Sequence, residues 1–336
     1  MNTTLSLPVS DTTQAGAARR AAAEWAYGYG WGEEMMGRVA LVVTELGRNL
    51  ALHTSAGGAL LIRRLCHAEA TGVEILSLDS GPGVANFNRC MRDGYSTAGT
   101  PGTGLGAVQR VSQFFNAYSQ EGIGTAIVSQ LWAKPPETLV NGRWLSSGVS
   151  VPLATEIVCG DSWTEQSGRA DTLRVMVADG LGHGDFAAQA ANRAGEIFIK
   201  YPGLEIAAVL ENMHLALGST RGAAVAIAEL DLTRKEVSFV GVGNILGAIL
   251  GHERMTHLVS LNGTIGAQCR TIRTFTYPWP DDGVLVMASD GIRSHWQMER
   301  YPGLVQRHPS LLAGVLYRDY VRGRDDATVV VVRQTL

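Results

Sequence analysis

The sequence has few cysteines, no excess of charge of either sign and no long apolar run. Its four cysteines are widely spaced without a CxxC pair, which indicates reduced thiols rather than a disulfide framework or a zinc site. The 28 basic and 31 acidic residues are spread along the chain, so no basic stripe indicates nucleic acid and no charged tail indicates a membrane surface. No apolar run approaches the roughly 20 residues of a membrane span, and the start resembles neither a signal nor a transit peptide, so we expect a cytoplasmic protein without membrane partners.

Length and composition indicate two globular domains. A chain of 336 residues with 46% hydrophobic content can bury at least one substantial core, and the prior on length is about two domains. Paired prolines and scattered polar residues after Trp132 interrupt every periodic pattern. We therefore predict domains at 1–133 and 141–336, joined by a linker at 134–140.

The first domain has a mixed helical and β pattern. Apolar residues at helical spacing predict helices over 11–27 and 33–53. Leu-rich and β-branched runs bounded by glycine predict strands over 58–65, 73–79 and 125–132. These elements predict an α/β domain.

A glycine-rich loop at 93–106 leads into a segment, 107–118, that we predict to be helical. Free N–H groups and the helix dipole at such a start favour phosphate. A dinucleotide-binding loop would need an apolar strand immediately before it, and DGYSTAGTP stands there instead. The candidate phosphate-binding residues are Gly102, Thr103, Gly104, Leu105 and Gly106.

Two shorter motifs accompany this loop. Glu45 and Asn49 project from the same face of a predicted helix, where an amide oxygen suits Mg²⁺ and a carboxylate can accept the proton of an attacking hydroxyl. Read alone, such a pair is commonplace on a helix surface. Asp79 follows a strand and can accept an amino hydrogen from a base, while Gly81 and Gly83 allow close backbone approach. Together the pieces indicate a nucleotide site.

The second domain has many short β-rich runs, the run 156–160 among them, and two helical stretches at 186–201 and 204–218. This pattern predicts stacked sheets flanked by helices.

Aspartates stand where apolar strands of this domain begin or end: Asp161, Asp179, Asp290, and Asp325 with its neighbour Asp326. A single Asp-Gly after a strand is an ordinary turn. Several such carboxylates can converge on one rim, and they then need a cation between them to remain ionised. Oxygen-only ligands favour Mg²⁺ or Mn²⁺, and two such ions can activate water for attack on phosphorus. We therefore expect phosphoester hydrolysis.

Two further residues have open roles. His183, in a glycine-rich loop, could protonate a leaving group or be a polar turn residue. Arg221 could bind substrate phosphate or be an exposed arginine before a strand.

In order along the chain, GDSW, VADGLGHG, RGAA, VGVGN, SDGI and GRDDATV resemble bacterial metal-dependent serine/threonine phosphatases of the sporulation and stress-response class. The similarity extends to the feedback phosphatase of the stressosome. It implies a PPM-type αββα domain with two Mn²⁺ or Mg²⁺ ions bridged by Asp179 beside the Gly180 carbonyl. By the same resemblance, the remaining metal ligands are Asp161, Asp290 and Asp325, with Asp326 less favoured.

ELGRN, DSGPG and DGYSTAGTPGTGLG resemble the ATP-binding fold shared by gyrase, the ninety-kilodalton chaperone, histidine kinases and MutL. The most similar members are the serine-kinase switch protein of the stressosome and the related anti-sigma kinases. The resemblance implies a GHKL (Bergerat) α/β sandwich that binds ATP with Mg²⁺. The roles that it implies are Mg²⁺ binding for Asn49, adenine recognition for Asp79 with Gly81 and Gly83, a lid for 93–106, and the catalytic carboxylate for Glu45.

Both resemblances together predict a partner-switching regulator. The first domain would phosphorylate a serine or threonine of a STAS-domain antagonist or stressosome scaffold protein, and the second would remove that phosphate. A sigma factor or another downstream regulator is a further candidate partner. The alternatives are a phosphatase whose N-terminal domain only binds nucleotide and a partner, and a non-enzymatic anti-sigma factor.

Overall fold

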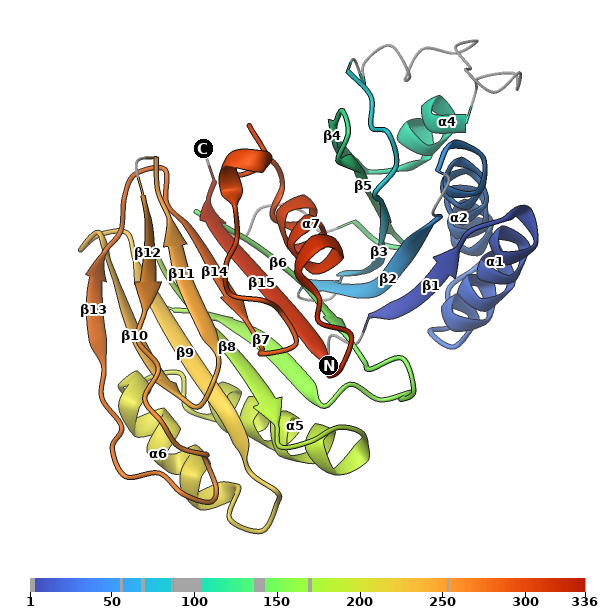
Figure 1. Ribbon diagram of the computed structural model, residues 1–336. Helices are drawn as coiled ribbons and strands as arrows, with labels where there is room; N and C mark the ends of the chain where they lie inside the picture. The colour runs from blue at the N-terminus through green and yellow to red at the C-terminus, as the bar shows by residue number, and fades with distance from the viewer. Residues whose placement is uncertain are drawn as a thin grey trace. The chain divides into compact units, whose positions relative to one another are not determined.

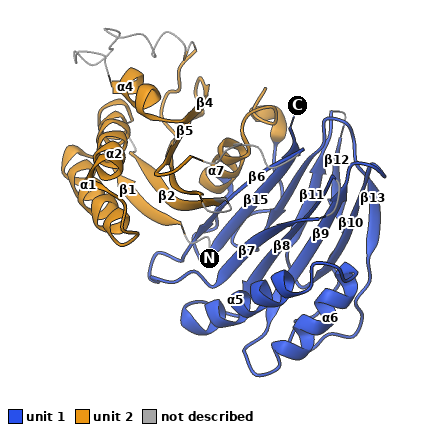
Figure 2. Ribbon diagram, turned by 180° about the vertical axis from the view of Figure 1, so that it is seen from behind, with its two compact units in different colours: residues 1–3, 140–297, 319–336 blue, residues 4–139, 298–318 orange. Residues whose placement is uncertain are grey.

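The computed structural model places the chain in two compact units (Figures 1 and 2). Residues 4–139 with 298–318 form the N-terminal unit, and residues 140–297 with 319–336 form the C-terminal unit. No helix among the described residues is both long and apolar enough to cross a membrane. The described residues are 4–54, 57–67, 70–85, 87, 104–135, 143–168, 171–252 and 254–335.

The N-terminal unit contains a five-stranded sheet of order β1-β2-β3-β5-β4, in which every neighbouring pair is antiparallel. The three strands expected from the sequence lie within β2, β3 and β5. Its strands are β1 (Leu5–Val9), β2 (Gly58–His67), β3 (Ala70–Asp79), β4 (Phe114–Gln120) and β5 (Gly124–Trp132).

Helices α1 (Thr12–Tyr27), α2 (Glu33–His53) and α4 (Gly104–Val111) contribute to the core on one face of this sheet (Figure 1). Apolar residues of α2 recur at helical spacing, and Leu46 in the middle of that stripe is fully buried. Because side chains alternate along a strand, Val73 and Ile75 of β3 meet these helices. The two predicted N-terminal helices are confirmed.

The predicted helix over 107–118 is wrong in its second half. The helix ends at Val111, and Phe114–Gln120 form β4, which pairs along its length with β5. Aromatic residues suit a half-buried sheet surface, and pairing with β5 satisfies the backbone in a way that local periodicity does not reveal.

The segment 298–318 joins the N-terminal unit although it lies far along the chain. It contains the 3-10 turn η1 (Met298–Arg300) and most of helix α7 (Pro309–Tyr320). The sequence did not indicate this helix. The domain limits 1–133, 134–140 and 141–336 stay a prediction.

The C-terminal unit contains two five-stranded sheets, of order β13-β10-β9-β8-β7 and β12-β11-β14-β15-β6. The first sheet is built from β7 (Asp161–Ser167), β8 (Thr172–Gly180), β9 (Ala223–Asp231), β10 (Glu236–Val242) and β13 (Phe275–Pro278). The second is built from β6 (Trp144–Val151), β11 (Leu246–Leu250), β12 (Met255–Leu258), β14 (Val284–Ala288) and β15 (Ala327–Gln334).

Side chains of both sheets share one core, and α5 (Asp185–Lys200) and α6 (Ile206–Ala216) cover the other face of the first sheet. Along β8, Val177 points into the core between the sheets and Met176 toward the helices. The predicted fold class is confirmed: an α/β domain is followed by stacked sheets flanked by helices. The expected strand over 156–160 is wrong, since the strand begins at Asp161.

Candidate nucleotide and metal sites

The nucleotide-site candidates on α2 lie beside its buried stripe. Glu45 and Asn49 are both half-buried, whereas Leu46 and Leu50 between and beyond them enter the core. Their spacing places both polar side chains on one face of the helix. The structure thus leaves this pair at the edge of the core, where a ligand can reach it.

The start of α4 meets α2 at Glu45. A Cβ placed on Gly104 would lie 2.5 Å from Glu45 Oε2, so the start of α4 lies directly beside that carboxylate. Leu105 packs against the core from the first turn of α4, and Gly106 is buried. The remaining loop candidates, Gly102 and Thr103, lie outside the described residues, as does most of the predicted lid.

The Asp79 turn is held by its own side chain and by the neighbouring hairpin. Asp79 Oδ1 accepts hydrogen bonds from the Gly81 N–H at 2.8 Å and the Thr125 N–H at 3.3 Å. Gly83 has φ +66°, and a Cβ there would lie 2.1 Å from the carbonyl oxygen of Gln120. Burial raises the pKa of Asp79, while its backbone hydrogen bonds oppose that shift. Its half-buried carboxylate can accept a hydrogen bond from a base.

A cavity of about 440 Å³ lies beside β4, between Val84, Phe115 and Arg307 among others. Glu45, Asn49 and Asp79 are not among its lining residues. It is therefore separate from the predicted nucleotide-binding residues.

In the C-terminal unit, strand ends bring the predicted carboxylates together. Asp161 of β7 lies directly opposite Asp179 of β8 in the antiparallel pair. Asp290 follows β14 and Asp325 precedes β15, and the charges of both act on Asp179. Gly180 packs so tightly on α5 that a Cβ would lie 2.0 Å from the carbonyl oxygen of Ala187.

The electrostatics show a cluster short of positive charge. Burial, followed by repulsion from Asp161, Asp290 and Asp325, raises the pKa of Asp179 to about 9. Burial likewise raises the pKa of Asp161 to about 7, against a hydrogen bond from Ser289. The pKa of Asp290 is also raised, first by burial and then by Asp325. Holding these groups ionised together is costly without a cation.

The donor chemistry fits a divalent cation, although the present arrangement is not yet a coordination shell. No three carboxylate, imidazole or thiol groups in the described parts of the chain are close enough to hold one ion. The cluster nevertheless offers oxygen ligands only, and a bound cation would remove the repulsion that raises these pKa values. The metal-ligand assignment therefore remains a prediction that the electrostatics support.

Asp326 has a structural role. Its two carboxylate oxygens accept hydrogen bonds from the N–H groups of Leu153 at 2.8 Å and Gly160 at 2.9 Å. Asp325 is the freer carboxylate, since the hydrogen bond described for it is the one that its Oδ1 accepts from the adjacent Asp326 N–H at 2.9 Å. The geometry agrees with the preference for Asp325 as a ligand.

Two of the carboxylates are oriented by neighbouring side chains that the sequence did not identify as part of the site. Ser289 Oγ donates to Asp161 Oδ2 at 2.6 Å, and its oxygen accepts the Thr328 N–H at 2.9 Å. Asn244 Nδ2 donates to Asp290 Oδ2. Asn244 ends the VGVGN motif, which was the only sequence signal for it.

His183 and Arg221 both lie near the Asp179 loop. His183 Nδ1 is 2.6 Å from Glu156 Oε1, a pair that holds the imidazole in place. The Arg221 guanidinium lies 4.9 Å from the centre of the exposed Phe186 ring and beside Gly182. Both side chains are thus positioned rather than free, and their roles in catalysis stay open.

The three cysteines that the structure describes are free thiols: Cys66, Cys159 and Cys269. The expectation of reduced cysteines is confirmed for these, and Cys90 lies outside the described residues.

The chain combines two domain folds, a histidine kinase-like ATPase fold and a PP2C/SpoIIE-type phosphatase fold. Residues 9–130 match the family model of the histidine kinase-like ATPase domain, and residues 169–335 match that of stage II sporulation protein E. The serine/threonine-protein kinase RsbT of Bacillus subtilis (strain 168) is 32% identical over 118 residues, which cover 35% of this chain and 88% of RsbT. The chain therefore belongs, through its N-terminal domain, to the RsbT family.

Solved structures support the fold of the rest. A protein from a structural study of the bacterial stressosome has a TM-score of 0.54 at 23% identity, covering 57% of this chain and all of that one. RsbX in complex with magnesium has a TM-score of 0.51 at 18% identity and covers 58% of this chain and 98% of RsbX. A SpoIIE fragment from Bacillus subtilis has a TM-score of 0.50 at 14% identity over 97% of this chain and 94% of the fragment. At these identities the likeness concerns the fold.

Proposed function

We propose that this protein is a bifunctional partner-switching regulator. Its N-terminal domain phosphorylates a serine or threonine of a STAS-domain antagonist or stressosome scaffold protein, and its C-terminal domain removes that phosphate. The observation that carries the proposal is the presence, in one chain, of an RsbT-like domain that contains Glu45, Asn49 and Asp79 and of a second unit with a cluster of buried and half-buried carboxylates.

In the phosphatase domain, two Mn²⁺ or Mg²⁺ ions would be held by Asp161, Asp179, Asp290, Asp325 and the Gly180 carbonyl. When bound, such ions supply charge neutralisation at the phosphoryl oxygens and a nucleophile at neutral pH. Ser289 and Asn244 hold two of the carboxylates in orientation. His183, whose Nδ1 contacts Glu156 Oε1, would give a proton to a leaving hydroxyl.

In the kinase domain, Asn49 would bind the Mg²⁺ of ATP, Asp79 the adenine, and the start of α4 the phosphates. Phosphoryl transfer asks mainly for positioning and charge stabilisation, so a single carboxylate suffices to receive the proton of the attacking hydroxyl. Glu45 is next to the start of α4, which supports that role.

The phosphatase activity is tested with a small aryl phosphate. We expect Mn²⁺-dependent hydrolysis by the full chain and a loss of about 100-fold or more in Asp290→Asn. Asp282→Asn, the same change at an exposed carboxylate, is the matched control and should retain activity. Undiminished hydrolysis by Asp290→Asn would reject the assigned site.

The kinase activity is tested with radiolabelled ATP and a purified STAS-domain protein, using Asp179→Asn so that the label is not removed. Label should appear on the partner and disappear when Glu45→Ala is added. Glu34→Ala, an exposed position on the same helix, should keep the label. A protein that binds ATP and the partner but never transfers label would establish the alternative, a phosphatase with a nucleotide-binding regulatory domain.

A further inference from the structure

The segment 298–318 packs with the N-terminal unit, yet along the chain it begins shortly after Asp290 and ends shortly before Asp325 (Figure 2). The loops that carry two predicted metal ligands therefore lead into and out of a segment that packs with the N-terminal unit, although it lies within the residues that match the sporulation protein E model. What this segment touches decides whether the connection has a function.

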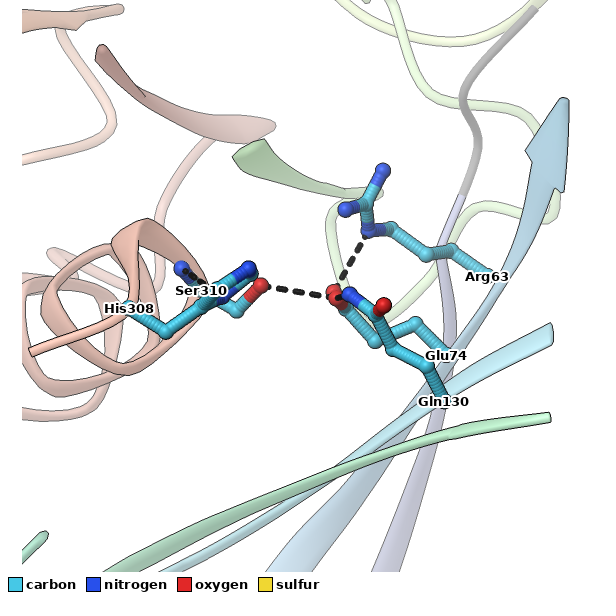
Figure 3. A network of polar contacts seen from close by, with 5 residues as sticks. All are labelled: Arg63, Glu74, Gln130, His308 and Ser310. Carbon is cyan, nitrogen blue, oxygen red and sulfur yellow. Dashed lines mark hydrogen bonds and ion pairs between the residues drawn. The ribbon is translucent and has the colours of Figure 1, made fainter. Parts of the chain in front are cut away.

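Its first contact is a buried carboxylate on the sheet. Arg63, Glu74 and Gln130 are cross-strand partners on β2, β3 and β5, so their side chains form a row on one face. Glu74 is 1% exposed and accepts from Arg63 Nε at 2.8 Å, Gln130 Nε2 at 2.8 Å and Ser310 Oγ of α7 at 2.7 Å (Figure 3). Ser310 thus completes the set of donors that a buried charge requires.

The charge of Glu74 is maintained by these neighbours. Burial alone would raise its pKa, but the charge and hydrogen bond of Arg63, followed by His308 and Ser310, bring the pKa below its ordinary value. Segment 298–318 therefore contributes two of the groups that keep Glu74 ionised. Its docking is specific in charge as well as in shape.

The second contact is tight packing of α7 on β3. A Cβ on Gly314 would lie 2.5 Å from Leu76 Cδ2 and 2.9 Å from Leu78 Cδ2. These leucines point away from the helix-covered face, because they alternate with Val73 and Ile75. The absence of a side chain at Gly314 allows this close approach.

The third contact reaches the nucleotide site. Arg318 Nη1 donates to the backbone carbonyl of Asp79 at 2.6 Å. Gly124 packs on the same carbonyl, and Arg318 Nη1 lies near Gly124 as well. The Asp79 side chain in turn accepts the Gly81 N–H. The end of the segment therefore holds the backbone of the residue predicted to recognise adenine.

We propose that Arg318 is a positioning residue of the nucleotide site, and that segment 298–318 couples nucleotide binding at Asp79 to divalent-cation binding at Asp290 and Asp325. Ordering the Asp79 turn fixes Arg318, which stands only a few residues before Asp325, so a ligand at either site lowers the ordering cost at the other. Coupling of this kind is reciprocal and typically changes affinity about fivefold to 150-fold. This inference rests on the proposed function.

The test measures the affinity of a fluorescent ADP analogue for the full chain at constant Mg²⁺ concentration, in a double-mutant cycle. Asp290→Asn should weaken ADP binding at least about fivefold in the wild-type background and have no further effect in Arg318→Met. Arg318→Met should itself weaken ADP binding, and Arg318→Lys, which keeps one donor, should restore part of it. Arg300→Met, at an exposed arginine of the same segment, should leave both the affinity and its response to Asp290→Asn unchanged.

A second variant gives the same answer by another route. Gly314→Val should lift α7 from β3 and abolish the response of ADP binding to Asp290→Asn, whereas Gly37→Ala, where a Cβ meets open space, should not. If Asp290→Asn abolishes phosphatase activity but leaves ADP affinity unchanged, or changes it equally in Arg318→Met, the coupling is refuted and the proposed function stands. If the wild-type chain binds no ADP, both fail.

Discussion

Replacing Asp179 by asparagine should remove a pH dependence from the stability of the metal-free C-terminal unit. The folded-state pKa of Asp179 is about 9, raised first by burial and then by the charges of Asp161, Asp290 and Asp325. In the unfolded chain an aspartate titrates near 4. Between about pH 4 and 9 the folded state thus holds a proton that the unfolded state has released, and stability falls as pH rises through this window.

The magnitude follows from the size of the shift. One pKa unit corresponds to about 1.4 kcal/mol, so raising the pH from 7 to 9 should cost the wild type about 2 kcal/mol through Asp179. Asp161, with a pKa of about 7, is already half ionised at pH 7 and adds only a few tenths of a kcal/mol. An asparagine has no proton to lose, so most of this loss should be absent in Asp179→Asn.

The assay is urea unfolding in EDTA at pH 7 and pH 9. Because the chain has two units, hydrogen exchange of β8 peptides should identify the transition of the C-terminal unit. Asp282→Asn, at an exposed carboxylate, should behave as the wild type. At pH 9, added Mn²⁺ should stabilise the wild type far more than it stabilises Asp179→Asn. Equal losses between pH 7 and 9 in wild type and Asp179→Asn would refute the electrostatic reasoning.

Three further changes have defined outcomes. Glu74→Ala removes the carboxylate of the buried ion pair with Arg63 and should destabilise the N-terminal unit by about 3 to 5 kcal/mol in urea unfolding; a change under about 1 kcal/mol would contradict the burial argument. Asp326→Ala strands the N–H groups of Leu153 and Gly160 and should cost about 2 kcal/mol or more, with Asp326→Asn milder; equal midpoints for the two variants would argue against a structural role. Leu46→Ala, fully buried in α2, should cost about 2 to 5 kcal/mol, as read from the urea midpoint.

Much of the fold was predictable because its elements have strong local patterns. The helices expected over 11–27 and 33–53 are α1 and α2, and the strands expected in the first domain lie within β2, β3 and β5. The error at β4 has a physical cause: its backbone is satisfied by β5, and that pairing does not appear in the periodicity of the segment itself.

The candidate sites were predictable to a similar extent. Aspartates at strand ends indicated a carboxylate cluster, and the pairing of Asp161 with Asp179 brings two of them face to face. The position before the strand does not separate Asp325 from Asp326, and the preference for Asp325 came from the family resemblance. Their different hydrogen bonds support that preference, because Asp326 satisfies two backbone N–H groups of the loop between β6 and β7.

The sequence alone predicted two domains, the motifs of their chemistry and the candidate residues of each site, all of which are local in the chain. The uniform burial of β3 implies a cover on both faces of the sheet, but nothing in that pattern identifies the second cover. Only the tertiary structure shows that the second cover comes from the segment that contains Ser310 and Arg318. Ser310 contacts Glu74 across 236 residues of the chain, and Arg318 contacts Asp79 across 239 residues. Contacts across such separations depend on the folded backbone that brings them together, and this is why the place of segment 298–318 in the N-terminal unit appears only in three dimensions.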